Sequence, residues 1–156
     1  METKRLKIVF AASSGGHYEQ LLMLRPLMEE HDSVIVTEKT AYQAAVPGIK
    51  TYYLRQVNRR ERSFLPRMIG NLFSSIRIWH REKPDAVICT GVLAMIPLCL
   101  LAKLHRRKLI YLESFAKVTS PTETGKLLYR FADRFYVQWE SMKEIYPRAI
   151  CLGGIY

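Results

Sequence analysis

The sequence lacks the cysteine pairs that metal and disulfide sites require. Its 156 residues include three cysteines, Cys89, Cys99 and Cys151, which lie far apart and form neither a CxxC pair nor an even set. This spacing argues against a zinc ribbon and against a disulfide framework. No DxD cluster of metal-binding carboxylates is present either. We therefore expect three reduced thiols in a cytosolic protein and no metal.

The sequence also lacks a hydrophobic run long enough to cross a bilayer. The most apolar stretch, GVLAMIPLCLLAKL at 91–104, contains Pro97 and falls short of the roughly 20 residues that a spanning helix needs. The short apolar run near the N-terminus ends in a glycine turn without a cleavage site, so we expect no signal peptide. The stretch 91–104 predicts either a buried helix or a surface that dips into a membrane.

Acidic residues are scarce: 14 Asp and Glu stand against 24 Lys and Arg, which gives a formal net charge of +10. Such a charge indicates a polyanionic partner, which is phosphate, nucleic acid or an anionic membrane surface. Between Arg55 and Lys83, eight basic and two acidic residues give a local charge of +6. No recognisable RNA- or DNA-binding motif accompanies the charge, so we expect no nucleic-acid partner.

The basic stretch contains an amphipathic pattern over 64–82. One interpretation is an ordinary helix that packs its apolar side on the core. The other is a helix that lies on anionic lipid. In that case Phe64 and Leu65 form its leading edge, with Arg67 and Met68 beside them as membrane-binding residues.

Apolar runs of strand length alternate with helical patterns along the chain. This alternation predicts an α/β fold, a Rossmann-like parallel sheet with helices on both faces, in a single domain over 1–156. Ligands of such sheets bind beyond the carboxyl ends of the strands, which are the loops 13–17, 38–42, 55–63, 90–92 and 113–121. Strands are predicted at 6–12, 33–37, 50–54, 85–89, 108–113 and 134–139, and helices at 18–30 (with Pro26 inside), 64–82, 92–105 and 122–132.

The turn SSGGHYEQ after the first strand matches no nucleotide-binding loop. A dinucleotide loop needs a third glycine, and the Gly125-Lys126 pair lacks the flanking residues of a Walker loop. Small residues before a helix still let backbone N–H groups approach a phosphate or carboxylate. His17 is the candidate base there, because a helix N-terminus favours a neutral imidazole that accepts a proton. The alternative is a structural histidine that caps the turn.

Five ordered blocks of the sequence resemble one protein family, and together they run through nearly the whole chain. They are similar to the PssD-like (Alg14-type) subunits of split GT-B glycosyltransferases. These subunits act in bacterial capsule and exopolysaccharide synthesis and in the eukaryotic addition of a second GlcNAc to dolichol-linked sugar. The blocks are SSGGHYEQLLML (13–24), CTG (89–91), ESFAKV (113–118), TGKLLYRFADRFYVQW (124–139) and YPRAICLGG (146–154).

The resemblance implies the N-terminal, acceptor-side half of a GT-B enzyme, similar to the same half of MurG. A separate PssE-like (Alg13-type) subunit is expected to bind most of the UDP-sugar, so this chain needs no cofactor of its own. The implied activity is inverting transfer of galactose, GlcNAc or glucuronic acid to an undecaprenyl-diphosphate-linked saccharide. The implied location is peripheral, at the cytoplasmic face of the plasma membrane.

The resemblance also gives roles to individual residues. His17 matches the histidine of the family's glycine loop and is the expected base, while Glu113 of the ES element is a rival base or a structural hydrogen-bonding residue. Two other functions stay open for the whole chain: a non-catalytic membrane adaptor that activates its partner, and an RNA-binding domain. The residues expected to bind the acceptor are Ser14, Gly15, Gly16, Thr90, Gly91 and Ser114.

Overall fold

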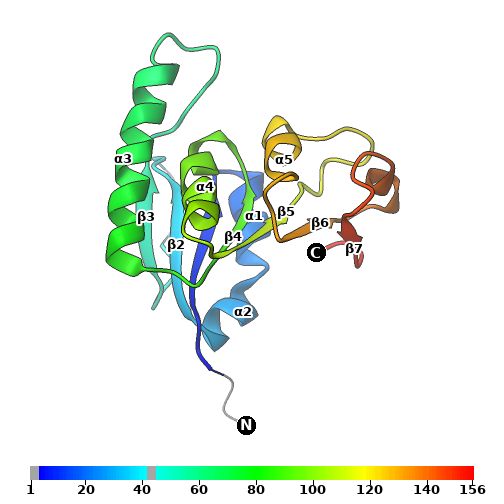
Figure 1. Cartoon of the computed structure of the whole chain (residues 1–156), viewed down its shortest axis with the longest axis horizontal. Coiled ribbons are helices and arrows are strands. Elements are labelled where there is room, and N and C mark those ends of the chain that lie inside the picture. Colours follow the sequence, from blue (N-terminus) through cyan, green and yellow to red (C-terminus); the bar gives the residue numbers. More distant parts are fainter. Residues whose placement is uncertain (1–3, 42–44) are drawn as a thin grey trace.

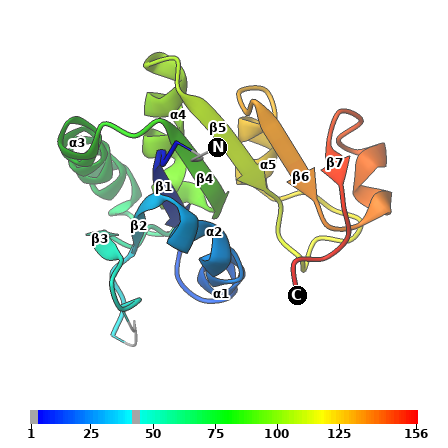
Figure 2. The same cartoon turned by 90° about the horizontal axis from the view of Figure 1, so that it is seen from below.

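The computed structural model describes residues 4–41 and 45–156, so position 42 of the predicted loop 38–42 lies outside the described part. Seven parallel strands form one sheet in the order β3-β2-β1-β4-β5-β6-β7 (Figures 1 and 2). Helices cover both of its faces, as predicted. The elements are β1 (Lys7–Ala12), α1 (Gly16–Leu22), α2 (Arg25–Glu30), β2 (Asp32–Glu38), β3 (Lys50–Leu54), α3 (Phe64–Glu82), β4 (Ala86–Gly91), α4 (Ile96–Leu104), β5 (Lys108–Leu112), α5 (Glu123–Leu128), β6 (Arg134–Val137) and β7 (Ile150–Cys151), with 3-10 turns at Leu93–Met95 and Glu140–Glu144.

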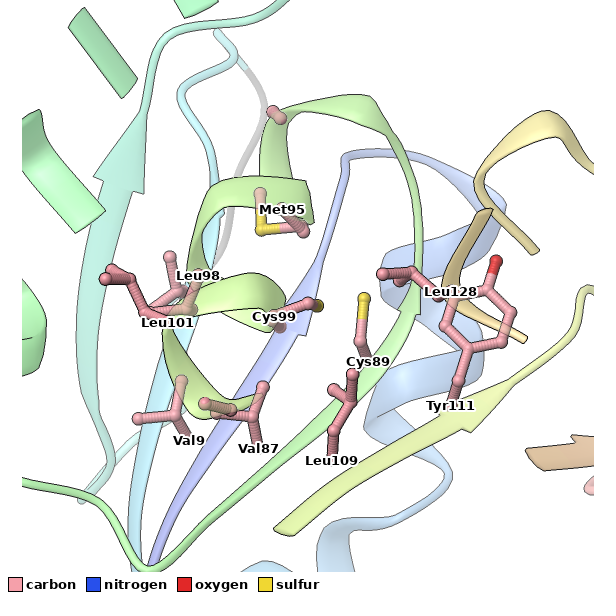
Figure 3. Packing of buried hydrophobic residues seen from close by; sticks show 14 of the residues in the cluster. Val9, Val87, Cys89, Met95, Leu98, Cys99, Leu101, Leu109, Tyr111 and Leu128 are labelled. Atoms are coloured by element: carbon pink, nitrogen blue, oxygen red, sulfur yellow. The ribbon is translucent and has the colours of Figure 1, made fainter. Parts of the chain in front are cut away.

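The core lies on both sides of β1, which pairs with β2 and β4. Successive side chains of a strand point to opposite faces. Val9 and Ala11 therefore join the cluster under α3, α4 and α5, which Figure 3 shows from close by. Ile8 and Phe10 join the cluster under α1 and α2. Burial on both faces explains why β1 is an unbroken apolar run.

The six predicted strands are confirmed, and β7 is an additional short strand at the sheet edge. The predicted helix 18–30 is instead two helices, because Pro26 lies in the first turn of α2, where its missing N–H costs no helical hydrogen bond. Pro97 has the same place in α4.

The stretch 91–104 resolves into a 3-10 turn and α4. Leu98, Cys99 and Ala102 are fully buried, whereas Leu100 and Leu104 are exposed. Among the described residues, no helix has both the length and the apolar character needed to cross a membrane. All three cysteines are free thiols.

At the amino edge of the sheet, Glu82 joins the end of α3 to β1 and β3. Its side chain is 5% exposed and lies 3.1 Å from Lys7 Nζ and 2.6 Å from Lys50 Nζ, and the Tyr52 hydroxyl also donates to it. Burial raises the pKa of Glu82, but the hydrogen bonds from Lys50, Tyr52 and Lys7 outweigh burial and lower the pKa to about 2.

We predict that Glu82→Gln lowers the free energy of unfolding at pH 7 by roughly 2 kcal/mol. The folded pKa of about 2 lies below the ordinary value of 4.5, so this stabilisation is complete above pH 4.5 and disappears as the pH falls towards 2. Urea unfolding at pH 7 and pH 3 measures it, and the variant should approach the wild type at pH 3. Glu29→Gln, which breaks the exposed pair with Arg25, is the control with a change under about 0.5 kcal/mol. Equal stabilities of Glu82→Gln and wild type at pH 7 would contradict the prediction.

Candidate functional site

The glycine turn and the loop after β4 meet at the carboxyl edge of the sheet. The Ser13 N–H donates to the Gly91 carbonyl at 2.7 Å. Parallel strands bring all their carboxyl ends to one edge, so the turn before α1 lies between the ends of β2 and β4. This contact places the predicted residues of the two loops side by side.

His17 and Thr90 bind each other through two hydrogen bonds. His17 Nδ1 lies 2.7 Å from the Thr90 carbonyl oxygen, and Thr90 Oγ1 donates to the His17 carbonyl at 2.7 Å. Because a carbonyl only accepts, Nδ1 carries the hydrogen. A neutral His17 then keeps the lone pair of its ring on Nε2. The ring is half-buried, and in this tautomer Nε2 is the nitrogen that can accept a proton.

The absence of a side chain at Gly91 leaves room for the His17 ring. Gly91 has φ +113°, and a Cβ built there would lie 3.0 Å from His17 Nδ1. Both Thr90 and Gly91 are buried. Their observed contacts position His17, and direct contact with an acceptor remains a prediction for both of them.

The other two glycines of the site lie at the surface of the turn. Gly15 has φ +71° and its carbonyl accepts from the N–H groups of Tyr18 and Glu19, which begins α1. No heavy atom lies within 4 Å of a Cβ built on Gly15 or Gly16. The turn is therefore open to a ligand beside His17.

Glu38, at the carboxyl end of β2, begins the predicted loop 38–42, but sequence reasoning does not single it out as a site residue. It is 4% exposed. Its Oε2 accepts from the N–H and the hydroxyl of Ser14 at 3.3 Å, and its Oε1 accepts from the Val57 N–H at 3.3 Å. Glu38 thus joins the glycine turn to the basic loop 55–63. A single acid at a strand end carries no pattern, and only the pairing of β1 with β2 brings it beside Ser14.

Asn71 of α3 holds the start of the same basic loop. Its Oδ1 accepts from the Arg55 N–H at 2.9 Å and its Nδ2 donates to the Arg55 carbonyl at 2.8 Å. Asn71 is 1% exposed, so both bonds are shielded from water. Arg59, Arg60 and Arg62 remain exposed at the tip, which rises above the sheet at the top of Figure 1.

Glu113 follows β5 and turns its carboxylate into the protein. The residue is 1% exposed. Its carboxylate accepts from the Ser114 N–H at 2.9 Å, the Thr122 hydroxyl at 2.9 Å and the Tyr146 hydroxyl at 3.1 Å. Burial, followed by the Glu113 carboxylate, raises the pKa of Tyr146, which keeps that hydroxyl a donor. These contacts are those expected of a structural hydrogen-bonding residue, which is the alternative role for Glu113. Ser114 takes part in the same network through its N–H.

Gln20 of α1 connects the Glu113 segment to the glycine turn. Its Nε2 donates to the Glu113 carbonyl at 3.3 Å and its Oε1 accepts from the Phe115 N–H at 3.0 Å. Gln138 also donates to the Glu113 carbonyl, at 3.0 Å. Helix α1 therefore contacts two strand ends: His17 binds the end of β4, and Gln20 binds the loop after β5.

The N-terminal half of α3 does not pack its apolar side on the core. Its exposed side chains include Leu65, at 65% exposed, with Ile69 and Leu72, whereas Asn71 and Ser75 are buried. The interpretation of an ordinary core-facing helix is therefore wrong for this half. Phe64, Arg67 and Met68 are half-buried.

Comparison with known sequences identifies a family. The family model described as "Oligosaccharide biosynthesis protein Alg14 like" matches residues 29–155. The UDP-N-acetylglucosamine transferase subunit ALG14 of Rattus norvegicus is 31% identical over 179 residues, which cover 96% of this chain and 83% of that protein. The subunit of the same name from Yarrowia lipolytica is 30% identical over 172 residues, covering 92% of this chain and 78% of that protein.

Solved structures share the fold at low sequence identity. MurG of Acinetobacter baumannii matches 86% of this chain with a TM-score of 0.66 and 18% identity, over 42% of that chain. The UDP-N-acetylglucosamine 2-epimerase of Rickettsia bellii matches 97% of this chain with a TM-score of 0.73 and 12% identity, over 45% of that chain. This chain therefore spans less than half the length of each, and the predicted Rossmann-like fold is confirmed.

We predict that Gly91→Ala displaces the His17 ring. Gly48→Ala is the matched control: Gly48 also has a positive φ, of +79°, but no atom lies within 4 Å of its Cβ position. Both substitutions should cost about 1 kcal/mol for the backbone conformation. Gly91→Ala should cost a further 1 kcal/mol or so, because its methyl group meets His17. Only this variant should shift the His17 ring signals in NMR spectra, and unchanged signals would contradict the proposed packing.

Proposed function

The chain belongs to the Alg14 family, and on this premise we propose that it is the acceptor-binding subunit of a two-subunit inverting glycosyltransferase. The donor is a UDP-sugar, bound mainly by a separate Alg13-type (PssE-like) subunit. The names of the relatives, UDP-N-acetylglucosamine transferase subunits, favour GlcNAc over galactose and glucuronic acid. The acceptor is an undecaprenyl-diphosphate-linked sugar of bacterial polysaccharide synthesis.

The orientation of His17 is the observation that carries this proposal. With Nδ1–H donating to the Thr90 carbonyl, Nε2 accepts the proton of an acceptor hydroxyl. The hydroxyl oxygen then bonds to the anomeric carbon of the UDP-sugar, and the bond from that carbon to the UDP oxygen breaks with inversion. The Thr90 carbonyl stabilises the imidazolium that results, because it continues to accept from Nδ1–H.

The open turn beside His17 supports acceptor binding at the same place. Gly15 and Gly16 are exposed and have free space around them, so they can line a sugar or diphosphate next to the base. Ser14 is held by Glu38, which sets the direction of the turn. Glu113 has its carboxylate in a buried network, and we assign it to positioning the loop after β5.

We predict that His17→Ala lowers kcat of the complex by 10²-fold or more, the usual contribution of a general base. The assay contains the chain, its Alg13-type partner, UDP-GlcNAc and an undecaprenyl-diphosphate-linked sugar. His80→Ala, at an exposed histidine near the end of α3, is the control and should retain full activity. Glu113→Gln should lower the free energy of unfolding, because it replaces one buried acceptor oxygen by an NH2 group that faces other donors.

Full transfer by a His17→Ala complex that still binds its partner would favour the second candidate function, a non-catalytic adaptor that recruits and activates the partner. That candidate requires the exposed apolar side chains of α3 and no general base. The adaptor and the catalytic subunit share this surface and differ only in the role of His17.

We further propose that the chain attaches peripherally to the cytoplasmic face of the plasma membrane through the start of α3. Leu65 is 65% exposed there, with Phe64, Arg67 and Met68 around it. An apolar edge beside basic residues suits an anionic lipid surface. Arg67 is paired with Glu61 at 3.0 Å. Within residues 4–41 and 45–156, the exposed side chains of Arg59, Arg60 and Arg62 form no ion pair, so the basic loop supplies the charge nearby.

We predict that Leu65→Asp weakens binding to phosphatidylglycerol-containing vesicles by about tenfold, since it removes an inserted apolar group and adds a negative charge. Co-sedimentation with vesicles measures this. Val118→Asp, at an apolar residue that is 43% exposed on the loop after β5, is the control and should bind like the wild type. Salt at about 0.5 M screens the electrostatic attraction to the vesicles, so the binding that remains there measures the apolar contribution. Equal loss in both variants, or binding to RNA in place of vesicles, would contradict the proposal.

A further inference from the structure

An apolar groove runs between α3 and α4 on the outer side of the helix layer. The two helices lie on the same face of the sheet (Figures 1 and 2). Eight of the nine lining residues are apolar, and the hollow has a volume of about 630 Å³. Its walls include Ile69 and Leu72 from α3 and Pro97, Leu100 and Leu104 from α4, and Phe131 also lines it.

In the first half of α3, large apolar side chains face outward and polar side chains face the protein. Ile69, Leu72 and Phe73 are 47%, 41% and 67% exposed, while Asn71 and Ser75 are at most 1% exposed. Exposing large apolar side chains while burying polar ones costs free energy in water. A contiguous apolar patch of this kind marks a binding surface.

The charge around the groove indicates the chemistry of its ligand. The segment 55–108, which contains α3, β4, α4 and the loops between them, has twelve Lys and Arg residues and three Asp and Glu residues, a net charge of +9. The remainder of the chain has twelve basic and eleven acidic residues. An apolar groove within a positively charged layer is complementary to an amphiphile with an apolar chain and an anionic head.

One end of the groove lies towards the carboxyl edge that holds His17. Helix α3 follows the basic loop 55–63 and α4 follows the loop after β4, so both helices start at this edge. Met68, in the second turn of α3, and Pro97, in the first turn of α4, line the groove. This end of the groove is the one nearer the basic loop, and Glu38 and Asn71 tie this loop to the glycine turn and to α3.

We propose that the groove binds the isoprenoid chain of the acceptor lipid, with the diphosphate towards the basic loop. This inference rests on the proposed function and adds the part of the substrate that the sugar-binding turn does not contact. The nine residues of α4 are about 13 Å long, so the groove holds the part of the chain nearest the head group. A bilayer alone presents a flat surface, whereas a single chain can fill a concave groove.

Direct binding of geranylgeranyl diphosphate to the full chain tests this proposal without transfer activity. Leu72→Gln and Leu100→Gln change exposed positions of the groove, so the fold should persist, and circular dichroism checks it. Each variant should weaken binding of this probe by about tenfold, because it removes apolar contact area. Leu152→Gln, at an 83% exposed leucine outside the groove, is the control and should bind like the wild type.

Two further ligands show whether binding depends on the isoprenoid chain, on the diphosphate head group, or on any apolar chain. Inorganic diphosphate should bind the wild type and the groove variants equally weakly, and palmitate should bind the wild type at least tenfold more weakly than geranylgeranyl diphosphate. Three results would overturn the proposal: groove variants that bind the probe like the wild type, palmitate that binds equally well, or a wild-type dimer that the groove variants dissociate. If the groove proposal fails in this way, transfer by the wild-type complex to a short-chain acceptor would still support the proposed function. Failure of the groove proposal and failure of the proposed function are therefore distinguishable.

Discussion

Two hydrogen bonds between His17 and Thr90 hold the centre of the site together. Each residue is donor in one bond and acceptor in the other, at 2.7 Å, so the first turn of α1 cannot move without the end of β4. Gly91 allows this approach because a side chain there would meet the ring. The pair fixes the tautomer of His17, and the tautomer decides which nitrogen can take a proton. The turn, the ring and the strand end thus form one preorganised unit.

A basic loop connects this unit to the exposed apolar side chains of α3. Glu38 binds the loop at Val57 and the glycine turn at Ser14, while Asn71 binds the loop at Arg55. Asn71 and Ser75 lie where an ordinary helix would bury apolar side chains, and Leu65 and Leu72 of α3 face outward instead. This arrangement suits the proposed acceptor lipid. Its isoprenoid chain would lie between α3 and α4, its diphosphate near the basic loop, and its sugar beside His17.

The sequence alone predicts the central sheet well, because strands buried on both faces are continuous apolar runs. The strand β7 escapes prediction since two residues carry no periodicity. Pro26, in the first turn of α2, divides the predicted helix 18–30 in two, and local sequence alone does not distinguish such a division from a kink. The turn at His17 is visible as a motif. Glu38 is not, because its role depends on which strands are neighbours. The direction of α3 also depends on tertiary packing, which buries Asn71 and exposes Leu65.

The central claim is that this chain binds the acceptor and leaves the donor to its partner. NMR titration of the full chain without the partner tests it most directly, with separate additions of a water-soluble sugar-diphosphate acceptor analogue and of UDP-GlcNAc. The account predicts that the analogue shifts the signals of Gly15, Gly16 and the His17 ring, and that UDP-GlcNAc leaves them in place. Shifts of these signals by UDP-GlcNAc alone, with none from the analogue, would contradict it.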